Sequence, residues 1–409
     1  MINMQTTAVF ERQNKSLSNI AMLLLALLPM LHWYDIGLPI GLGEFLLTLL
    51  MILAIGLGQF KLSAYPKIFY VVWIYVAINW YCYDFYPDWK GILPGGVVFF
   101  IFAINVGVGI ILFNMDVLRK YMRWIVIVAI VIFWFQFAML HLGGTGHCFV
   151  PNLTGHFLYE DLTYPELVAK QLRSARPCAF FIEKSYMAYY MVIYLCIEFF
   201  HGNTKDILFS KLAIAIIVTL IMLQSGSGMV GMALLIVAKV LTFYWNKKTV
   251  RYLALLLAIP VLLFFFKLYV STDIGFAMLD RQTELSTEGT SGYTRIVEGY
   301  LYYSSLNDVQ KLFGTSYADL NNLTYLSYSN RNFSLNGIQY PLIQLGIVGL
   351  ILWLLFYIYV FRKTSICGKM CVLVYIVLSA LEVTYLGSYM VMLTIIPCSV
   401  LYKDRINAR

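Results

Sequence analysis

The sequence predicts an all-α polytopic membrane protein with about twelve transmembrane helices and two large outer loops. Hydrophobic residues make up 61% of the 409 residues and charged residues only 12%, whereas about 25% of residues are charged in a soluble domain. The mean hydropathy is +0.76. Apolar segments of near-membrane length recur along the chain, and Lys and Arg gather in alternate connections between them.

The apolar segments are assigned in chain order as membrane-spanning helices, which need roughly 17–25 residues each. The first follows a polar N-terminal stretch and is followed at once by the second, so it indicates a retained span rather than a cleaved signal peptide. The predicted spans are 18–34, 38–58, 66–83, 91–113, 122–142, 178–200, 211–225, 227–245, 252–270, 338–361, 370–386 and 388–402.

The placement of positive charge orients these spans. With the N-terminus in the cytoplasm, every inner connection carries at least two Lys or Arg, whereas most short outer connections carry none. An excess of Lys and Arg in cytoplasmic loops is the positive-inside pattern. Both termini are therefore predicted inside, and the long loops 143–177 and 271–337 outside. The whole chain, 1–409, is predicted to form a single transmembrane domain.

The two long outer loops have the composition of folded segments. In the first, a short amphipathic helix is predicted over 164–174, with Pro165 in its first turn. The second has about 65 residues, far beyond the roughly 15 of an ordinary connection, which indicates a functional and partly structured segment. Its many tyrosines suit either sugar rings or the membrane interface. They include Tyr293, Tyr300, Tyr302, Tyr303, Tyr317, Tyr325 and Tyr328.

Residues 173–190, at the end of the first outer loop, place charged groups beside an apolar segment. A helix is expected to begin at Pro177, since proline suits the first helical turn. Glu183 then lies about 9 Å along the helix axis, about a third of the way into a hydrocarbon core of roughly 30 Å. Ionisable groups at such depth face a cavity or a partner. The alternative is an Arg–Glu ion pair that only holds helices together.

Arginines on the predicted outer side indicate an anionic partner there. Guanidinium groups bind phosphate oxygens bidentately through charge-assisted hydrogen bonds. The alternative for each arginine is an ion pair with an acid of its own loop. Two further charges within predicted spans, Glu44 and Glu382, either line a cavity or pair with an arginine. The outer arginines are Arg173, Arg176, Arg281 and Arg295.

The segment Ser225-Gly226-Ser227-Gly228 lies between two predicted spans on the outer side. Glycine lets the backbone approach a ligand, and free N–H groups at a helix start favour anions. The alternative is a tight hairpin in which small residues allow close helix packing.

The sequence also excludes several classes of function. The seven Cys and five His lack the spacing of a metal site, and no GxxxxGK[ST] run is present. We therefore expect no metal and no cofactor. The net charge of +8 arises from the inner connections and does not indicate a nucleic-acid partner.

The sequence resembles the O-antigen polymerase (Wzy-type) family, which is related to the O-antigen ligases. The similarity covers most of the chain through its topology: many spans, two large outer loops, and a last loop that leads into a glycine-punctuated span. The chain departs from the family's Glu-Pro-Ser/His at Glu183-Lys184-Ser185. The local matches are Arg176-Pro177-x3-Phe181-x-Glu183-x-Ser185, Ser225-Gly226-Ser227-Gly228, Leu312-Phe313-Gly314, and Asn336 leading into Leu345-Gly346-Ile347-Val348-Gly349.

The resemblance implies a GT-C-like glycosyltransferase at the periplasmic face of the bacterial inner membrane. It would transfer a growing glycan from undecaprenyl diphosphate to a repeat unit on the same lipid, among membrane lipids and with a chain-length regulator protein as a further partner. Glu183 is expected to act as general base, and Arg176 to bind the donor diphosphate and stabilise the leaving group. The expected substrate-binding residues are Arg173, Ser185, Tyr186, Ser225, Ser227, Arg281, Arg295 and Asn336.

Two alternatives stay open. A ligase would attach the finished glycan to the lipid A core, but the family's ligases use a His in the last large outer loop, and this loop has none. A transporter or flippase of the lipid-linked sugar would show two similar halves with paired broken helices, and the sequence shows no such symmetry.

Overall fold

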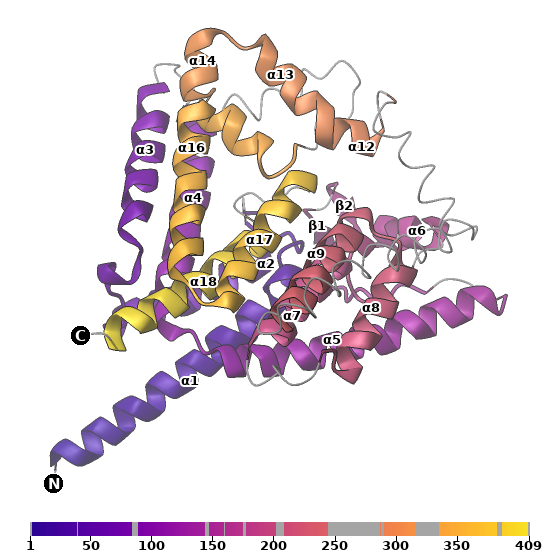
Figure 1. Cartoon of the computed structure of the whole chain (residues 1–409), viewed down its shortest axis with the longest axis horizontal. Helices are drawn as coiled ribbons and strands as arrows, with labels where there is room; N and C mark the ends of the chain where they lie inside the picture. The colour runs from indigo at the N-terminus through magenta and orange to yellow at the C-terminus, as the bar shows by residue number, and fades with distance from the viewer. Residues whose placement is uncertain are drawn as a thin grey trace.

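A computed structural model describes residues 2–38, 40–83, 89–143, 147–158, 160–174, 177–201, 208–243, 287, 290–315, 335–382 and 387–407. Helices dominate this part of the chain (Figure 1). Every predicted span overlaps a helix except 252–270, which lies outside the described residues. The helices at the predicted spans are α1 (Ile2–Leu31), α2 (Leu42–Gly56), α3 (Lys67–Tyr83), α4 (Trp89–Leu112), α5 (Met115–His141), α7 (Lys184–Phe200), α8 (Lys211–Leu223), α9 (Gly226–Phe243), α16 (Gln339–Lys363), α17 (Ile366–Leu381) and α18 (Ser388–Asn407).

Three of the described helices are long and apolar enough to cross a membrane, namely α5, α9 and α16. Seven further apolar stretches of 10–17 residues lie in α1, α2, α3, α4, α8, α17 and α18. The chain therefore has the helices of a membrane protein, while the number of twelve spans stays a prediction.

Helix α7 forms the centre of the bundle. Its residues from Met187 to Phe199 are all buried, in contact with α5, α8, α9 and α17. A helix that is buried on all sides normally carries apolar residues on every face. The buried acid Glu198 is an exception in α7. The Glu198 carboxylate accepts hydrogen bonds from Arg119 of α5, at 2.8 Å to Nη2, and from the Ser210 hydroxyl at 3.1 Å. This ion pair ties three helices together at one end of α7.

Side-chain caps determine where several helices begin. The Asn114 side chain accepts hydrogen bonds from two backbone N–H groups of the first turn of α5, and Ser210 and Ser365 cap α8 and α17 in the same way. These side chains satisfy N–H groups that have no partner within the helix.

The first predicted outer loop folds against the connection between α1 and α2. Strands β1 (His156–Phe157) and β2 (Leu162–Thr163) pair antiparallel, and α6 (Tyr164–Ser174) follows at once, as predicted. A small core joins the parts, since Tyr34 of the α1–α2 connection packs with Phe157 and Ile182. The Leu158 N–H donates to the Trp33 carbonyl at 2.8 Å. The loop therefore has a fixed position on the bundle.

The second predicted outer loop is partly helical, as expected, in the part that the structure describes. It contains α12 (Ser291–Tyr293), the single π-type turn η4 (Thr294–Glu298), α13 (Gly299–Ser305) and α14 (Asp308–Phe313). These short helices lie beyond one end of α16, at the top of Figure 1.

Helix α16 is broken at Gly346, where the backbone has φ 68° and ψ −175°. Gly314 also has a positive φ, of 90°, and the two glycines pack so closely that a Cβ on either would clash with the other segment's backbone. The carbonyls freed by the break find donors: Ile343 accepts from the Thr315 N–H at 2.9 Å, and Leu345 from the Tyr75 hydroxyl at 2.7 Å. Leu312-Phe313-Gly314 and Leu345-Gly346, distant in sequence, thus form one contact.

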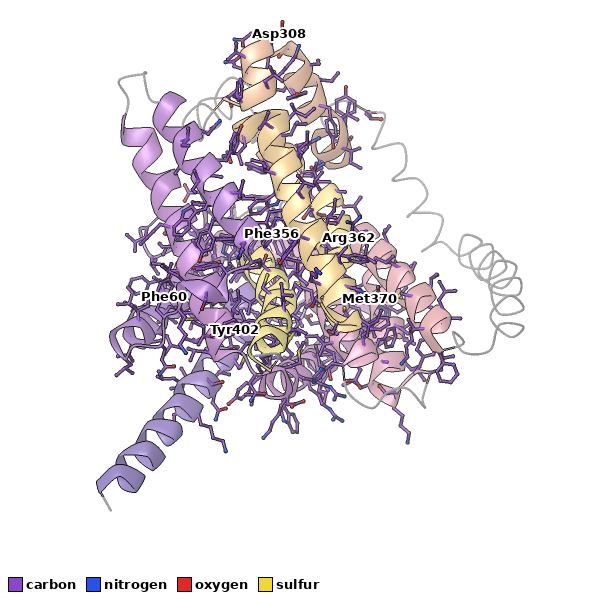
Figure 2. The ribbon with its side chains drawn as sticks, turned by 60° about the vertical axis from the view of Figure 1, so that its left-hand side comes forward. Phe60, Asp308, Phe356, Arg362, Met370 and Tyr402 are labelled. Atoms are coloured by element: carbon purple, nitrogen blue, oxygen red, sulfur yellow. The ribbon has the colours of Figure 1, made fainter. Side chains whose placement is uncertain are left out.

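The second predicted outer loop lies apart from residues at the predicted inner ends of three spans. Figure 2 shows Asp308 of α14 at one end of the molecule, and Phe60, Met370 and Tyr402 well away from it. The last three belong to or adjoin predicted inner segments, and Asp308 belongs to the second outer loop. This sorting agrees with the predicted topology, whereas the side of the membrane on which each end lies stays a prediction.

Candidate functional site

The segment before α7 differs from the sequence prediction. The helix begins at Lys184 rather than at Pro177, and Glu183 is its N-cap residue, with an extended backbone (φ −141°, ψ 153°). Residue Ala179 has a positive φ of 53°, a conformation that does not continue a right-handed helix. Its N–H donates to Gln136 Oε1 of α5 at 2.8 Å.

Two glutamines hold this segment in its non-helical path. Gln136 also donates from Nε2 to the His147 carbonyl at 2.7 Å. Gln171 of α6 donates from Nε2 to the Ile182 carbonyl at 2.9 Å. These glutamine side chains form hydrogen bonds with backbone N–H and C=O groups that would otherwise pair within a helix. The helix therefore starts at Lys184 rather than at Pro177. Glu183 is therefore half-buried at the N-terminal end of α7, called the mouth of the bundle below, and does not lie six residues into a helix as predicted; its depth in a membrane stays a prediction.

An arginine–carboxylate pair lies beside this mouth. Arg295 Nη1 of η4 is 2.5 Å from Glu382 Oε1, at the C-cap of α17. The Glu382 side chain is 11% exposed and that of Arg295 24%. Glu183 and Glu382 are close enough for their charges to interact, so two carboxylates and one guanidinium gather where α7, α17 and the second outer loop meet.

Asn336 and Gln339 fix the position of Arg295. Asn336 donates from Nδ2 to the Arg295 carbonyl at 2.9 Å, and Gln339 donates from Nε2 to the Ile296 carbonyl at 3.3 Å. The Gly337 N–H donates to the Glu382 carbonyl at 2.8 Å. The start of α16 is thus bound to both members of the ion pair. Asn336 acts here on the backbone that carries Arg295, and its predicted contact with substrate stays a prediction.

The other predicted arginines are not brought to this pair by the residues that the structure describes. Arg173 lies near the end of α6 and is exposed. Arg176 and Arg281 lie outside the described residues. For Arg295, the partner is an acid of α17 rather than an acid of its own loop, which resolves the alternatives for Glu382 in favour of an ion pair.

The serines of Ser225-Gly226-Ser227-Gly228 are engaged within the protein. Ser227 accepts a hydrogen bond from the Tyr189 hydroxyl at 2.8 Å, and Ser225 Oγ accepts from the Gly228 N–H at 3.4 Å. A Cβ on Gly228 would lie 2.6 Å from Ala188 Cβ. Gly228 thus allows α9 to pack closely on α7, which is the small-residue packing of the alternative, and a substrate role for the two serines stays a prediction.

Ser185 and Tyr186 follow Glu183 in the first turn of α7. The Ser185 hydroxyl is buried and has no hydrogen-bond partner among the described residues. The Tyr186 ring packs against Trp33, with centroids 4.6 Å apart, and its carbonyl accepts from the Tyr389 hydroxyl at 2.8 Å. Both predicted residues thus lie at the mouth beside Glu183.

Sequence reasoning missed a histidine–carboxylate pair next to this aromatic contact. His32 Nδ1, at the end of α1, lies 2.5 Å from Glu44 Oε1 in the first turn of α2. Glu44 was expected either to line a cavity or to pair with an arginine. The signal was available: the first two spans form a short hairpin, and such a hairpin places the end of one helix against the start of the next.

A cluster of potential metal ligands lies on the first outer loop. Ligand atoms of Asp35, His156 and Asp161 all lie within 4.8 Å of one another. The side chains of His156 and Asp161 are 52% and 93% exposed, and Asp35 accepts the Gly37 N–H at 2.7 Å. Exposed acidic groups of this kind are common on protein surfaces without a bound ion.

The chain was compared with known proteins. No protein-family model matches it, and no curated protein matches it.

Proposed function

We propose that the protein is a metal-independent glycosyltransferase of the O-antigen polymerase type, with a GT-C-like fold in the bacterial inner membrane and both termini in the cytoplasm. The donor is a growing glycan on undecaprenyl diphosphate, and the acceptor is a repeat unit on the same lipid. The observation that carries the proposal is the gathering of Glu183, Arg295 and Glu382 at one mouth of an apolar helical bundle.

The arginine supplies the group that a diphosphate needs. In this structure the Glu382 carboxylate pairs with Nη1 of Arg295. The Nε atom of Arg295 is buried and has no hydrogen-bond partner among the described residues. Phosphate oxygens bind guanidinium in the same bidentate manner as carboxylates. A donor diphosphate would therefore exchange with Glu382 and hold Arg295 through two nitrogens, with Arg173, Arg176 and Arg281 as further candidates for this role.

Glu183 supplies the proton acceptor. The acceptor hydroxyl oxygen attacks the anomeric carbon of the donor sugar, and Glu183 takes the hydroxyl proton as the new C–O bond forms. The bond between the anomeric carbon and the diphosphate oxygen breaks, and its electron pair leaves with the diphosphate. Arginine charge stabilises that leaving group. The half-buried position of Glu183 at an N-cap allows contact with both substrate and bundle.

The test is the distribution of repeat lengths in cells that carry Glu183→Gln or Arg295→Gln in place of the wild-type chain. We expect both variants to leave a single repeat on the lipid A core. Lys170→Gln is the matched control, because Lys170 is an exposed cation of the first loop, 2.5 Å from Glu160. Wild-type chain lengths in both site variants, with normal protein levels, would reject the proposal.

The same measurement, read on a gel of the cells' lipopolysaccharide, also distinguishes a polymerase from an O-antigen ligase. Loss of a polymerase leaves one repeat on the core, whereas loss of a ligase leaves the core bare. A bare core in the Glu183→Gln strain would therefore assign the protein to the ligase branch.

A transporter of the lipid-linked oligosaccharide is the second candidate, and the break in α16 at Gly346 favours it. Discontinuous helices carry the substrate sites of many secondary transporters. Product formation by the purified protein in detergent decides between the two, since transport needs a sealed membrane and glycosyl transfer does not.

A further inference from the structure

The His32–Glu44 pair is built by the connection between α1 and α2, residues 32–41, which folds back so that Gly41 lies against His32. His32 follows the last residue of α1, and Gly41 precedes α2. A Cβ on Gly41 would overlap the His32 carbonyl, so only glycine allows this approach. The approach places His32 Nδ1 2.5 Å from Glu44 Oε1. The pair is therefore a fixed feature of the hairpin.

The second carboxylate oxygen of Glu44 lacks a donor. Glu44 is 5% exposed, and its Oε2 has no hydrogen-bond partner among the described residues. An ionised carboxylate is an acceptor only, and buried polar atoms without partners are rare and call for an explanation. His32 covers the pair and is 22% exposed, so the pair lies close to the surface on that side.

Aromatic rings surround this acceptor. Trp33 lies edge-on to His32, with centroids 4.5 Å apart, and packs against Tyr186 at 4.6 Å. The rings form a partly exposed cluster with Tyr389, whose hydroxyl holds the Tyr186 backbone. Aromatic rings beside a carboxylate acceptor suit a sugar. The C–H groups of a sugar can pack on the rings, and its hydroxyls can donate hydrogen bonds to the carboxylate.

The cluster adjoins the proposed general base. Ile182, next to Glu183, and Tyr34, next to Trp33, belong to the same buried core. The Trp33 carbonyl is held by the Leu158 N–H of the first loop. A sugar on Trp33 would therefore lie near Glu183, which follows Ile182 at the start of α7.

We propose that His32, Trp33, Glu44 and Tyr186 form the binding subsite for the acceptor saccharide. A sugar hydroxyl donates to Glu44 Oε2, His32 holds Glu44 in place through Oε1, and the sugar ring packs on the aromatic cluster. The ligand is assigned to the acceptor because a general base must lie next to the hydroxyl that it deprotonates. This assignment rests on the proposed function, whereas saccharide binding at the subsite does not.

The experiment measures saccharide binding and catalysis separately on the full chain in detergent. The probe is the repeat-unit oligosaccharide released by mild acid from the lipid-linked intermediates of the source cells, and its affinity is measured by titration calorimetry. The variants are Glu44→Gln, which keeps the side-chain shape, and Trp33→Ala. The matched control is His201→Gln, since His201 Nε2 pairs with Asp116 at 3.0 Å and is 28% exposed, at the other end of α7.

Glu44→Gln is expected to weaken binding about tenfold or more, because a hydrogen bond to a charged acceptor is lost. Trp33→Ala is expected to weaken it by up to about tenfold. In transfer assays both raise KM for the acceptor and leave KM for the donor unchanged, and His201→Gln binds as wild type. Folding of each variant is checked by its elution profile and thermal midpoint.

The outcomes separate the two proposals. Wild-type affinity and acceptor KM in a folded Glu44→Gln variant overturn the subsite, while loss of transfer in Glu183→Gln would leave the proposed function standing. Binding that depends on Glu44 in a protein without transfer activity overturns the proposed function and keeps the subsite. A rise in donor KM alone overturns the assignment to the acceptor.

Discussion

At the scale of single residues, charge decides which side chains meet. A buried carboxylate is costly unless a cation or donors compensate it, and the described acids of the bundle follow this rule. Glu382 pairs with Arg295, Glu198 with Arg119, and Glu44 with His32. Each pair joins segments that are separate in the sequence. The acids were visible in the sequence, but their partners lie on other helices.

The Arg295–Glu382 pair should contribute to stability as well as to the site. Arg295→Gln leaves the buried Glu382 without its cation and beside Glu183, so we expect a loss of about 3 kcal/mol in the free energy of unfolding. The double variant Arg295→Met with Glu382→Leu should recover most of it, because no unpaired charge is left. Thermal unfolding in detergent checks both. A single variant as stable as wild type would show that the pair is not buried as described.

At the scale of elements, backbone breaks rather than helix lengths shape the site. Helix α7 starts at Lys184 because Gln136 and Gln171 bind the backbone before it. Helix α16 breaks at Gly346 because Leu312-Phe313-Gly314 packs there. Apolar periodicity does not reveal either feature, since both depend on a donor or a close contact from another element.

The glycine contact should be sensitive to one added methyl group. Gly346→Ala places a side chain at a positive φ, which costs roughly 1–2 kcal/mol, and adds a clash with the Leu312 carbonyl. We therefore expect a larger loss of unfolding free energy than φ alone imposes. Gly56→Ala in the last turn of α2 is the control, because a Cβ there meets nothing within 4 Å. Equal thermal midpoints for the two variants would contradict the contact.

At the scale of the whole molecule, Asp308 of the second predicted outer loop lies at one end, well away from Phe60, Met370 and Tyr402 (Figure 2). The central helix α7 is surrounded by other helices; the first predicted outer loop packs against Ile182 just before α7, and the second is joined to α17 through the Arg295–Glu382 pair. The candidate site thus lies where residues from both halves of the chain converge, at one end of an apolar bundle.

Cysteine labelling tests this arrangement across the membrane. Asp308→Cys and Lys61→Cys place thiols on exposed positions at the two ends. In a background with Cys82 and Cys148 replaced by Ser, an impermeant maleimide added to intact spheroplasts should label position 308 only. Position 61 should react once the membrane is permeabilised. The reverse pattern would invert the predicted topology.

The sequence by itself determined the helices, because an apolar run of membrane length folds as a helix wherever it lies in the chain. It also determined α6, since Pro165 and a short amphipathic repeat suffice for a local helix. Only the tertiary structure decided where α7 begins, which acid each cation meets, and that two distant glycine segments share one contact. These features arise from hydrogen bonds and close contacts between elements that are far apart in the sequence. A local sequence pattern does not show which distant residue will form such a contact.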